Sequence, residues 1–488
     1  MYSVNGLKQA TTLFLVVIIL ACLAFAPDAR AADCPSVCDG WFGNTALGID
    51  ALSDNSNGQN NTAIGQAALL SNTDGNYNTA VGSHSLVSNI DGTFNAAIGS
   101  NTLRLNTSGS YNTASGASAL EFTTTGSENT ASGFIALWRN TTGDHNTANG
   151  GRALTNNTTG RDNAATGFLS LYSNTTGGAN TAHGTYALYS NTTGTLNSAA
   201  GFQALLHNST ASYNTGIGAQ ALYSNTTGWF NTATGQGTLY RNTTGTGNSA
   251  LGFSAQIGNV AGNYNTAVGF NALNFNAVGS NNTAVGVEAL RNINGTNNVA
   301  LGFQAGRGLT FGDGNVCIGA GILGHAGESN TTRIRNIYSS VASGRAVYIG
   351  SDNKIGTLAS SRQFKEEIKP MEKASETLFK LKPVTFRYKK ELDAERALSF
   401  GLITEDVAEI SLELITRDEK GNPQTVRYDA VNAMLLNEFL KEHRKNEEQQ
   451  ATIAMLEQQI EALTAGLQRV NAQLELSKPA PRTVKNTD

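Results

Sequence analysis

Polar and apolar residues repeat along most of this chain with a period of seventeen. The stretch NTALGIDALSDNSNGQN, which begins at Asn44, is followed by NTAIGQAALLSNTDGNY from Asn61, and the pattern returns at every seventeenth residue up to Asn282. Two further units begin at Asn298 and Asn315. Four positions define the unit, with Asn first, Ala third, Gly fifth and Leu ninth. A short period kept over fifteen starts without an insertion indicates that each unit forms one turn of a stack.

The composition of the unit favours strands over helices. It contains no proline and no helical spacing of apolar residues, and two short alternating stretches, NTAVG and xxALxxN, are separated by Gly and by NTTG turns. We expect Ala and Leu to point inward and Gly to occupy corners with unusual backbone angles. Stacked Asn and Thr side chains can bridge successive rungs by hydrogen bonds. The predicted fold is mainly β, with a parallel β-solenoid of 17-residue rungs over residues 44–320, about 75 Å long at ~4.8 Å per rung.

The pattern changes after residue 320. Residues 321–358 are predicted to form a connector with a β-hairpin, because two apolar stretches flank the turn sequence SDNK. Residues 359–445 then predict a small α+β domain. Its expected elements are a helix near 371–381, a strand over VTFRYKK, a strand pair around LELITRDEKGNPQTVRYD and a long helix from about Asp429.

That long helix carries an apolar seam. Its members follow one another at alternating spacings of three and four residues: Ile453, Leu456, Ile460, Leu463, Leu467, Val470 and Leu474. Such a heptad pattern predicts a coiled coil over residues 446–476, and mixed Ile and Leu permit three strands without fixing that number. Gly466 lies within it at a cost of about 1 kcal/mol in helix stability. Residues 477–488 are expected to form a flexible tail.

The N-terminal residues predict export. Lys8 precedes the apolar run TTLFLVVIILACLAFA, and small residues follow at Ala29 and Ala31, so residues 1–31 are predicted to be a signal peptide, with an uncleaved anchor as the alternative. Residues 32–43 would then form an N-terminal cap. There, Cys34 and Cys38 are close enough for a disulfide in an oxidising compartment, and a pair of free thiols is the alternative. We therefore expect a secreted or surface-displayed protein.

Charge and composition exclude several classes of function for the repeat. The formal net charge is -4, and no lysine occurs between Lys8 and Lys354, so no nucleic-acid partner is expected. Calcium-binding repeats need Asp at regular loop positions, which this unit does not have, and no metal site or cofactor is predicted. Ice binding needs an outward column of Thr, and Thr is not kept at one outward position of the unit. The repeat has few acids, and Glu121 and Asp162 among them do not share a column, which argues against an enzyme acting on polysaccharide.

Two other features of the repeat have open interpretations. The Asn-x-Thr triplets match glycosylation acceptors, but they recur with the turn, and turn asparagines are the favoured interpretation. Aromatic residues could stack on sugars of a surface glycan or simply cover the rod. They are scattered along the sequence, and examples are Trp138, Tyr172, Tyr189, Tyr223 and Trp229.

Three segments of the C-terminal domain resemble one known family. Ser360 is followed five residues later by Lys365 and then by Glu367-Ile368, FGLITEDVAEI begins at Phe400, and VRYDAVNAMLLNEFLKE leads into the last helix. Together they resemble the self-cleaving intramolecular chaperone at the C-terminus of phage endosialidase tailspikes and related tail fibres. The likeness covers about residues 359–445. It implies that the domain assembles three chains into a fibre and then releases itself with a Ser/Lys dyad.

The dyad implied by this resemblance is Ser360 as nucleophile and Lys365 as base. No His lies between His325 and His443, and a serine hydroxyl needs a base to become nucleophilic. An ordinary lysine, with a pKa near 10.4, is neutral in only about one molecule in 2,500 at pH 7. Because burial lowers the pKa of a lysine, such a dyad is expected to work only after folding and enclosure.

The chain departs from the family at one position. The family has Asp after the serine, whereas this chain has Ser361, which is also a reserve nucleophile. Cleavage is expected between Ser360 and Ser361, with the bond between Ala359 and Ser360 as the alternative. The function predicted is an exported homotrimeric fibre, adhesin-like or tail-fibre-like, that cleaves itself. The alternative is a structural rod whose C-terminal module trimerises it without proteolysis.

Overall fold

The chain divides into two compact units, Met1–Ser340 and Val341–Asp488. The computed structural model describes residues 42–337, 347–349, 355–356, 360–393, 395–418 and 420–478. The predicted signal peptide, the cysteine pair Cys34 and Cys38, the turn of the predicted hairpin and most of the predicted tail lie outside these residues. In the part of the chain that the structure describes, no helix is long and apolar enough to cross a membrane.

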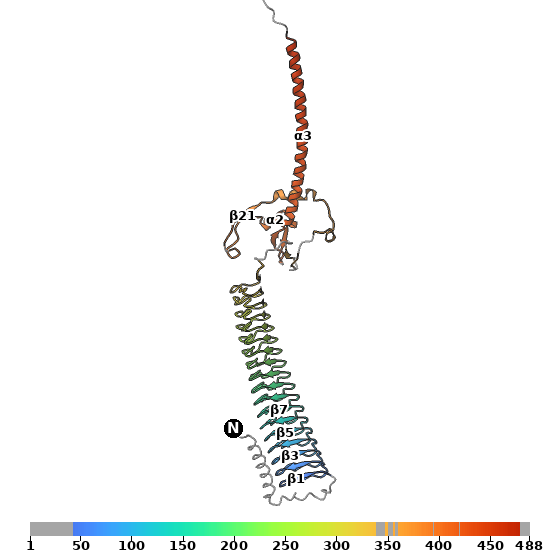
Figure 1. Ribbon diagram of the computed structural model, residues 1–488, viewed down its shortest axis with the longest axis vertical. Helices are drawn as coiled ribbons and strands as arrows, with labels where there is room; N and C mark the ends of the chain where they lie inside the picture. The colour runs from blue at the N-terminus through green and yellow to red at the C-terminus, as the bar shows by residue number, and fades with distance from the viewer. Residues whose placement is uncertain are drawn as a thin grey trace, which may run out of the picture. The chain divides into compact units, whose positions relative to one another are not determined.

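The first unit is a stack of three-residue strands, one from each rung (Figure 1). The strands are β1 Thr45–Leu47, β2 Thr62–Ile64, β3 Thr79–Val81, β4 Ala96–Ile98, β5 Thr113–Ser115, β6 Thr130–Ser132, β7 Thr147–Asn149, β8 Ala164–Thr166, β9 Thr181–His183, β10 Ser198–Ala200, β11 Thr215–Ile217, β12 Thr232–Thr234, β13 Ser249–Leu251, β14 Thr266–Val268, β15 Thr283–Val285, β16 Val299–Leu301, β17 Val316–Ile318 and β18 Thr332–Ile334.

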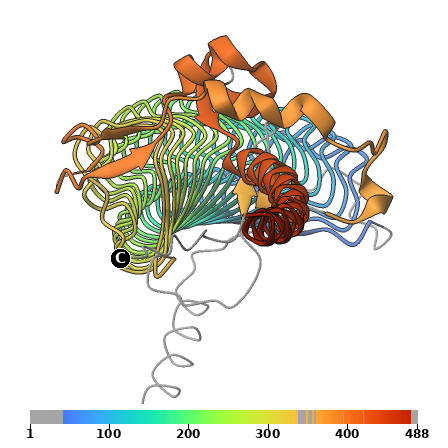
Figure 2. The same ribbon diagram turned by 90° about the horizontal axis from the view of Figure 1, so that it is seen from above.

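These strands form one 18-stranded sheet in which each strand pairs in parallel with that of the next rung. The pairing is in register, so that Thr62 faces Thr79 and Ala63 faces Ala80. We number the positions of a rung 1 to 17 from its first Asn, and call the same position in successive rungs a column. In Figure 2 the rungs lie one behind another with a gradual shift from each to the next. The predicted parallel β-solenoid of 17-residue rungs is confirmed.

Three columns form the core of the rod. The Ala of column 3 and the Ala and Leu of columns 8 and 9 are buried in one continuous cluster, as Ala63, Ala68 and Leu69 illustrate. Small and large side chains thus lie beside each other inside the stack, as the sequence predicts. Cys317 occupies column 3 of the rung that begins at Asn315, and burial raises the pKa of its thiol.

The prediction of a second strand in each rung was wrong. The stretch xxALxxN forms turns, and its Leu has a positive φ in rung after rung, for example φ 51° at Leu69 and at Leu86. The left-handed conformation aims the Leu side chain into the core while its N–H still donates to the next rung, from Leu69 to the carbonyl of Ser85 at 3.0 Å. Hydrogen bonds between rungs offset the backbone strain, so the leucines of column 9 keep the same register from rung to rung without forming a strand.

The Gly of column 5 is required both by its backbone angle and by close packing. Gly167 has φ 125°, and a Cβ added there would meet the backbone carbon of Gly184 at 2.7 Å. The glycines of successive rungs therefore stack directly on one another, which no larger residue permits. This arrangement confirms the predicted role of Gly at a corner.

Buried asparagines form two hydrogen-bonded ladders along the rod. In column 1, the backbone N–H of Asn78 donates to Oδ1 of Asn61 at 2.9 Å, and the Nδ2 of Asn78 donates to a turn carbonyl of its own rung at 2.8 Å. In column 12, Nδ2 of Asn89 donates to Oδ1 of Asn72 at 2.7 Å. These contacts confirm that Asn side chains bridge the rungs. Because the column 12 asparagines of the NTT turns are buried and doubly bonded, the Asn-x-Thr triplets serve the fold.

One residue interrupts the column 12 ladder, and its replacement is expected to stabilise the rod. Thr123 stands where Asn is usual, leaving Thr123 Oγ1 and Asn106 Oδ1 buried without a partner. In Thr123→Asn, the new side-chain Nδ2 would donate to Oδ1 of Asn106, and its Oδ1 would accept from Nδ2 of Asn140. We therefore expect the free energy of unfolding to rise by about 2 kcal/mol. Urea unfolding measures this. The control Asn157→Thr, which breaks an intact part of the ladder, should lower stability by a similar amount; a destabilising Thr123→Asn would contradict the assignment.

The second unit is a small α+β region followed by one long helix. Its elements are β19 Tyr348–Ile349, β20 Ile355–Gly356, the 3₁₀ helices η1 Arg362–Phe364, η2 Glu372–Lys380 and η3 Leu412–Leu414, β21 Val384–Phe386, β22 Ser399–Gly401, α2 Thr404–Ile410, β23 Ile415–Arg417, β24 Pro423–Val426 and α3 Tyr428–Leu476. Among the described residues of this unit, three antiparallel pairs form, β19 with β20, β21 with β22 and β23 with β24. The helix predicted near 371–381 is a 3₁₀ helix, and α3 runs through Gly466 without a break.

The core of this unit is very small. Four apolar side chains are buried together, Val407, Leu414, Ile415 and Val426, and α3 contributes only partly buried residues to them. Many large apolar side chains of the unit remain exposed; Phe379 and Phe400 are each 75% exposed. A core of this size offers little hydrophobic stabilisation to a single chain, because burial of apolar area is the main driving force for folding.

Candidate self-processing and assembly site

Ser360, Ser361 and Lys365 lie at the start of the C-terminal region, on either side of the single-turn helix η1. Ser361 precedes η1 in an extended conformation and its carbonyl accepts the N–H of Phe364 at 3.1 Å. Lys365 directly follows η1, and its N–H donates to the carbonyl of Arg362 at 3.1 Å. The turn therefore places the two serines and the lysine within one short loop, with the peptide bond between Ser360 and Ser361 at its edge.

All three candidate side chains are exposed in the single chain. Among the residues that the structure describes, no hydrogen bond joins the hydroxyl of Ser360 or Ser361 to the amine of Lys365. The single chain thus places the three candidate groups in one exposed loop without joining them.

A different serine and lysine are brought together by the fold. Ser375 of η2 is fully buried, and its hydroxyl donates to Glu438 Oε1 at 2.6 Å. The hydroxyl oxygen of Ser375 in turn accepts from Asn437 Nδ2 at 2.7 Å and from Lys441 Nζ at 3.3 Å. Lys441 Nζ also forms an ion pair with Glu438 Oε1 at 2.6 Å, so the amine is held by the carboxylate as well as by the serine. This cluster is therefore no nucleophile and base, but a polar clamp that attaches η2 to α3.

The clamp was not predicted from the sequence, although the spacing of its residues on α3 is a partial indication of it. Asn437, Glu438 and Lys441 are spaced so that they lie on one side of a helix. Their partner Ser375 lies more than sixty residues earlier in the chain, and nothing in the sequence indicates which polar residue of a charged segment will be buried. Only the fold makes that pairing visible.

The clamp is expected to weaken in acid. Hydrogen bonds from Lys441 and Ser375 lower the pKa of Glu438 below its ordinary value of 4.5. A carboxyl whose folded pKa is depressed stabilises the fold fully above its unfolded pKa, and this contribution is lost as the pH falls through the lower folded value. We expect helical circular dichroism, which reports mainly on α3, to show less cooperative thermal unfolding below about pH 4. Glu438→Gln should remove this pH dependence; an unchanged profile in that variant would contradict the role of the clamp.

The last helix exposes its whole apolar seam. Ile453, Leu456, Ile460, Leu463, Leu467, Val470 and Leu474 are each more than half exposed, from 51% at Leu456 to 67% at Leu463. No residue of α3 is buried in the chain. Further apolar side chains follow the same helix nearer its start, including Phe439 at 66% exposed, which the seam predicted from sequence did not contain. The seam is an unpartnered surface of the kind that coiled coils bury.

The rod carries columns of aromatic residues that contact one another. Tyr77, Phe94 and Tyr111 of column 17 stack at centroid distances of 4.8 and 5.1 Å and interplanar angles of 6°. The expectation that the aromatics are scattered was wrong for four of the five examples. Trp138, Tyr172, Tyr189 and Tyr223 share column 10, where Tyr172 and Tyr189 stack at 5.2 Å. Rings stacked in this way hide much of their faces from a sugar, which favours the covering role.

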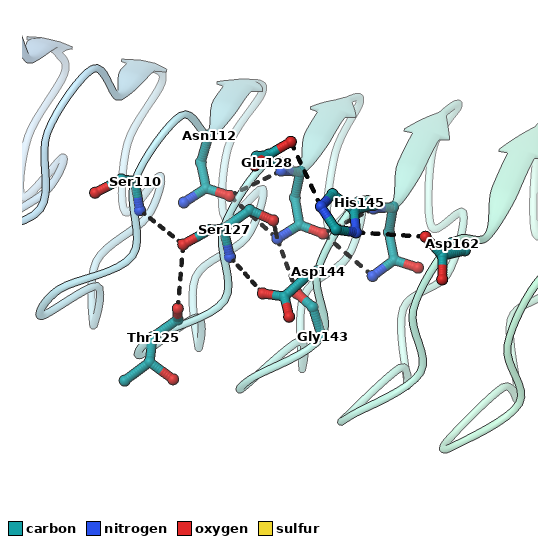
Figure 3. Close-up of polar contacts among 11 residues, drawn as sticks. Ser110, Asn112, Thr125, Ser127, Glu128, Gly143, Asp144, His145 and Asp162 are labelled. Carbon is teal, nitrogen blue, oxygen red and sulfur yellow. Dashed lines mark hydrogen bonds and ion pairs between the residues drawn. The ribbon is translucent and has the colours of Figure 1, made fainter.

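Acidic groups of the rod are engaged by neighbouring rungs. Figure 3 shows His145 between Glu128 and Asp162 of the adjacent rungs, with nitrogen–oxygen distances of 3.4 and 3.3 Å. Glu121 accepts from Arg104 at 3.0 Å and from Trp138 at 2.9 Å. No group of three or more His, Cys, Asp or Glu suited to a metal occurs among the described residues. These contacts stabilise the stack and do not pair two carboxyls for hydrolysis.

The expectation that Thr is not kept at one outward position of the rung was wrong. Thr occupies column 2 in twelve of the eighteen strands, and the strand burial patterns leave that column at the surface. The neighbouring outward column, column 4, varies from Leu47 to Asn149 and His183, so the sheet has no second Thr column beside the first.

One known protein family matches the sequence of this region. The match agrees with the loop that holds Ser360 and Lys365, the three strand pairs and the unpartnered helix. Residues 360–416 match the family model for the chaperone of endosialidase. No curated protein and no solved structure matches the chain. The resemblance stated from the sequence is confirmed for this chaperone segment, which begins at Ser360 and ends at Thr416, just before the last strand pair closes. A β-solenoid followed by a segment of this family fits a tail-fibre-like protein, and suggests an extracellular or phage-surface location.

Proposed function

We propose that this protein is an exported homotrimeric fibre whose C-terminal region aligns three chains and then cuts itself from the rod beside Ser360. The observation that carries the proposal is the match of residues 360–416 to the chaperone of endosialidase, which begins at the candidate serine itself. Three features of the second unit support it: its core is very small, its longest helix has an unpartnered apolar seam, and its candidate dyad is exposed.

Trimerisation would account for the surfaces that one chain leaves open. Three parallel copies of α3 would bury the seam from Ile453 to Leu474, and the exposed Phe379 and Phe400 offer further apolar area to neighbouring chains. Folding of the module would then depend on association, since its own core is too small to support it. Such dependence is what allows the module to select correctly assembled fibres.

Cleavage would follow the ordinary chemistry of a serine and a lysine. Once neighbouring chains exclude water from the loop around η1, Lys365 in its neutral form would take the proton of the Ser360 hydroxyl. For the bond between Ser360 and Ser361, the attacking oxygen would come from Ser360 of a neighbouring chain, because attack on its own carbonyl carbon would close a strained four-membered ring; for the alternative bond, Ser360 would attack the carbonyl carbon of Ala359 in its own chain. In either case the oxygen forms an ester, and the amide nitrogen leaves with the proton from the lysine. Water then hydrolyses the ester, so that one product ends in a carboxylate and the other begins with an amino group.

The proposal is tested by the mass of the exported protein, measured under native and denaturing conditions. We expect a native complex of three chains and, on denaturation, a rod chain that ends at Ser360, or at Ala359 if the alternative bond is cut. The first residue after removal of the signal peptide is read from the same measurement. A monomeric complex would contradict the assembly role, and a trimer of chains that retain Asp488 would contradict cleavage.

The second candidate is a structural rod that trimerises without proteolysis. It is favoured by Ser361, which stands where the family has Asp, and by the absence of a hydrogen bond between either serine and Lys365 in the described loop. In that case the module remains attached as an assembly clamp, and the trimer of uncleaved chains described above is the expected product.

A further inference from the structure

One face of the rod is exposed, long and free of charge. The sheet of β1 to β17 presents the side chains of columns 2 and 4 outward, because the strands bury only their central residue, and column 6 follows at the same edge. We call these three columns, from Thr45 to Ala320, the sheet face. None of its 51 positions is Asp, Glu, Lys or Arg.

The rod does carry charges, and all of them lie elsewhere. Asp, Glu and Arg occur at seventeen positions between residues 44 and 320, all in columns 7, 10, 11, 14, 16 and 17. The surface of a soluble domain is usually about a quarter to a third charged. A face of this length without any charge therefore differs from an ordinary solvated surface, although the chain places charges freely on the other sides of the same rungs.

The sheet face also carries exposed apolar side chains beside the Thr and Ser of column 2. Column 6 supplies a series of Phe side chains that are each about half exposed: Phe134, Phe168, Phe202, Phe253, Phe270 and Phe303. Column 4 adds aliphatic residues at both ends of the rod, such as Ile98 at 52% and Leu251 at 51% exposed. Exposed apolar side chains that gather on one uncharged face favour a surface that a partner covers.

We propose that the sheet face is covered by the same face of the other copies of this chain, so that the rods contact one another along their whole length. This inference rests on the proposed trimer and names the surface by which its rods associate. Only a partner with the same spacing of about 4.8 Å can meet such a face rung by rung. A second copy has that spacing and the same length, and parallel copies around one axis bring equivalent rungs to the same height, with their sheet faces turned toward the axis.

The available area is sufficient for such contact. Seventeen rungs at about 4.8 Å, with a face about 13 Å wide, give on the order of 1,000 Å² on each chain. Stable interfaces bury about 800 Å² on each partner. The second unit independently leaves the seam of α3 open, and one homomeric assembly would cover both surfaces. A partner recognised by charge, such as a nucleic acid or an acidic polysaccharide, finds no counter-charge on the sheet face.

Cysteine cross-linking within a single rung tests the proposal. The full chain is prepared with Cys22→Ser, Cys34→Ser, Cys38→Ser and Cys317→Ala, the last of which restores the usual residue of column 3. Ala219→Cys places a thiol in column 6, and the matched control Thr227→Cys places one in column 14 of the same rung. Each variant is treated with a short bismaleimide after its native mass has been measured.

We expect cross-linked dimers from Ala219→Cys at a level about tenfold above those from Thr227→Cys, since facing thiols have a high effective concentration. Equal cross-linking of both variants, or none from Ala219→Cys, in a protein with the mass of a trimer would overturn the inference and leave the proposed trimer intact. A monomeric native mass would instead overturn the proposed trimer, and the inference with it.

Discussion

Replacement of Ser360 or Lys365 by alanine is expected to abolish release of the C-terminal fragment and to leave the trimer intact. In the proposed mechanism the serine supplies the oxygen that attacks and the lysine supplies the base that removes its proton, so the loss of either group would remove the reaction. We expect the cleaved fraction to fall by at least about a hundredfold, the size of effect usual for a general base. Denaturing mass measurement of the exported chain, with native mass beside it, provides both readouts.

Three further variants separate chemistry from structure at this loop. Lys365→Arg keeps the positive charge but cannot act as a base, because a guanidinium does not deprotonate in proteins, and it should also stay uncleaved. Lys369→Ala removes a lysine of the same exposed segment and should be cleaved like the wild type. Cleavage in Ser360→Ala that disappears in the double variant with Ser361→Ala would assign the nucleophile to Ser361; cleavage that persists in the double variant would overturn the serine mechanism.

Ser361→Asp restores the residue that the family has after its serine. If that Asp positions the scissile bond, this variant should be cleaved faster than the wild type. A slower reaction would show that the hydroxyl of Ser361 itself contributes. The rate of appearance of the fragment after assembly distinguishes the two outcomes.

The architecture of the rod could be predicted because its information is local and repeated. A period of seventeen, with Gly in column 5 and Ala in column 3, determines the turn and the core of every rung, and the parallel register follows from the absence of insertions. The conformation of Leu69 and its equivalents could not be read in the same way. An alternating pattern normally indicates a strand, and only the hydrogen bonds between rungs make a positive φ at a leucine acceptable.

In the C-terminal region, the family and the order of elements could be predicted, but the contacts between distant segments could not. The segment from Ser360 to Thr416 is specific in sequence, so its family and its order of elements followed from motifs. The clamp of Ser375 with α3 could not be predicted, because it depends on a contact between distant segments. The environment of Lys365 also could not be predicted, since in one chain it is solvent and only neighbouring chains could change it.

Two substitutions in the seam of α3 are expected to prevent assembly. Leu463→Asp and Leu467→Asp, made together, place two carboxylates on each chain where the proposed coiled coil requires apolar side chains. Truncation of one buried leucine alone costs about 2–5 kcal/mol, and a buried charge costs more, so three chains with two such changes each should not associate at micromolar concentration. Native mass measurement should then show monomers.

The same variant tests the proposed link between assembly and cleavage. Ser360 and Lys365 are exposed in one chain, and in the proposed trimer the neighbouring chains would enclose them. The monomer with Leu463→Asp and Leu467→Asp should therefore remain uncleaved although Ser360 and Lys365 are intact. The control Gln458→Asp with Ala472→Asp adds the same charges to α3 at exposed positions outside the seam, and should give cleaved trimers. An efficiently cleaved monomer would contradict the link, since it would show that the loop around η1 activates its own lysine. If the monomer stays uncleaved and the control trimer is cleaved, cleavage occurs only after correct assembly.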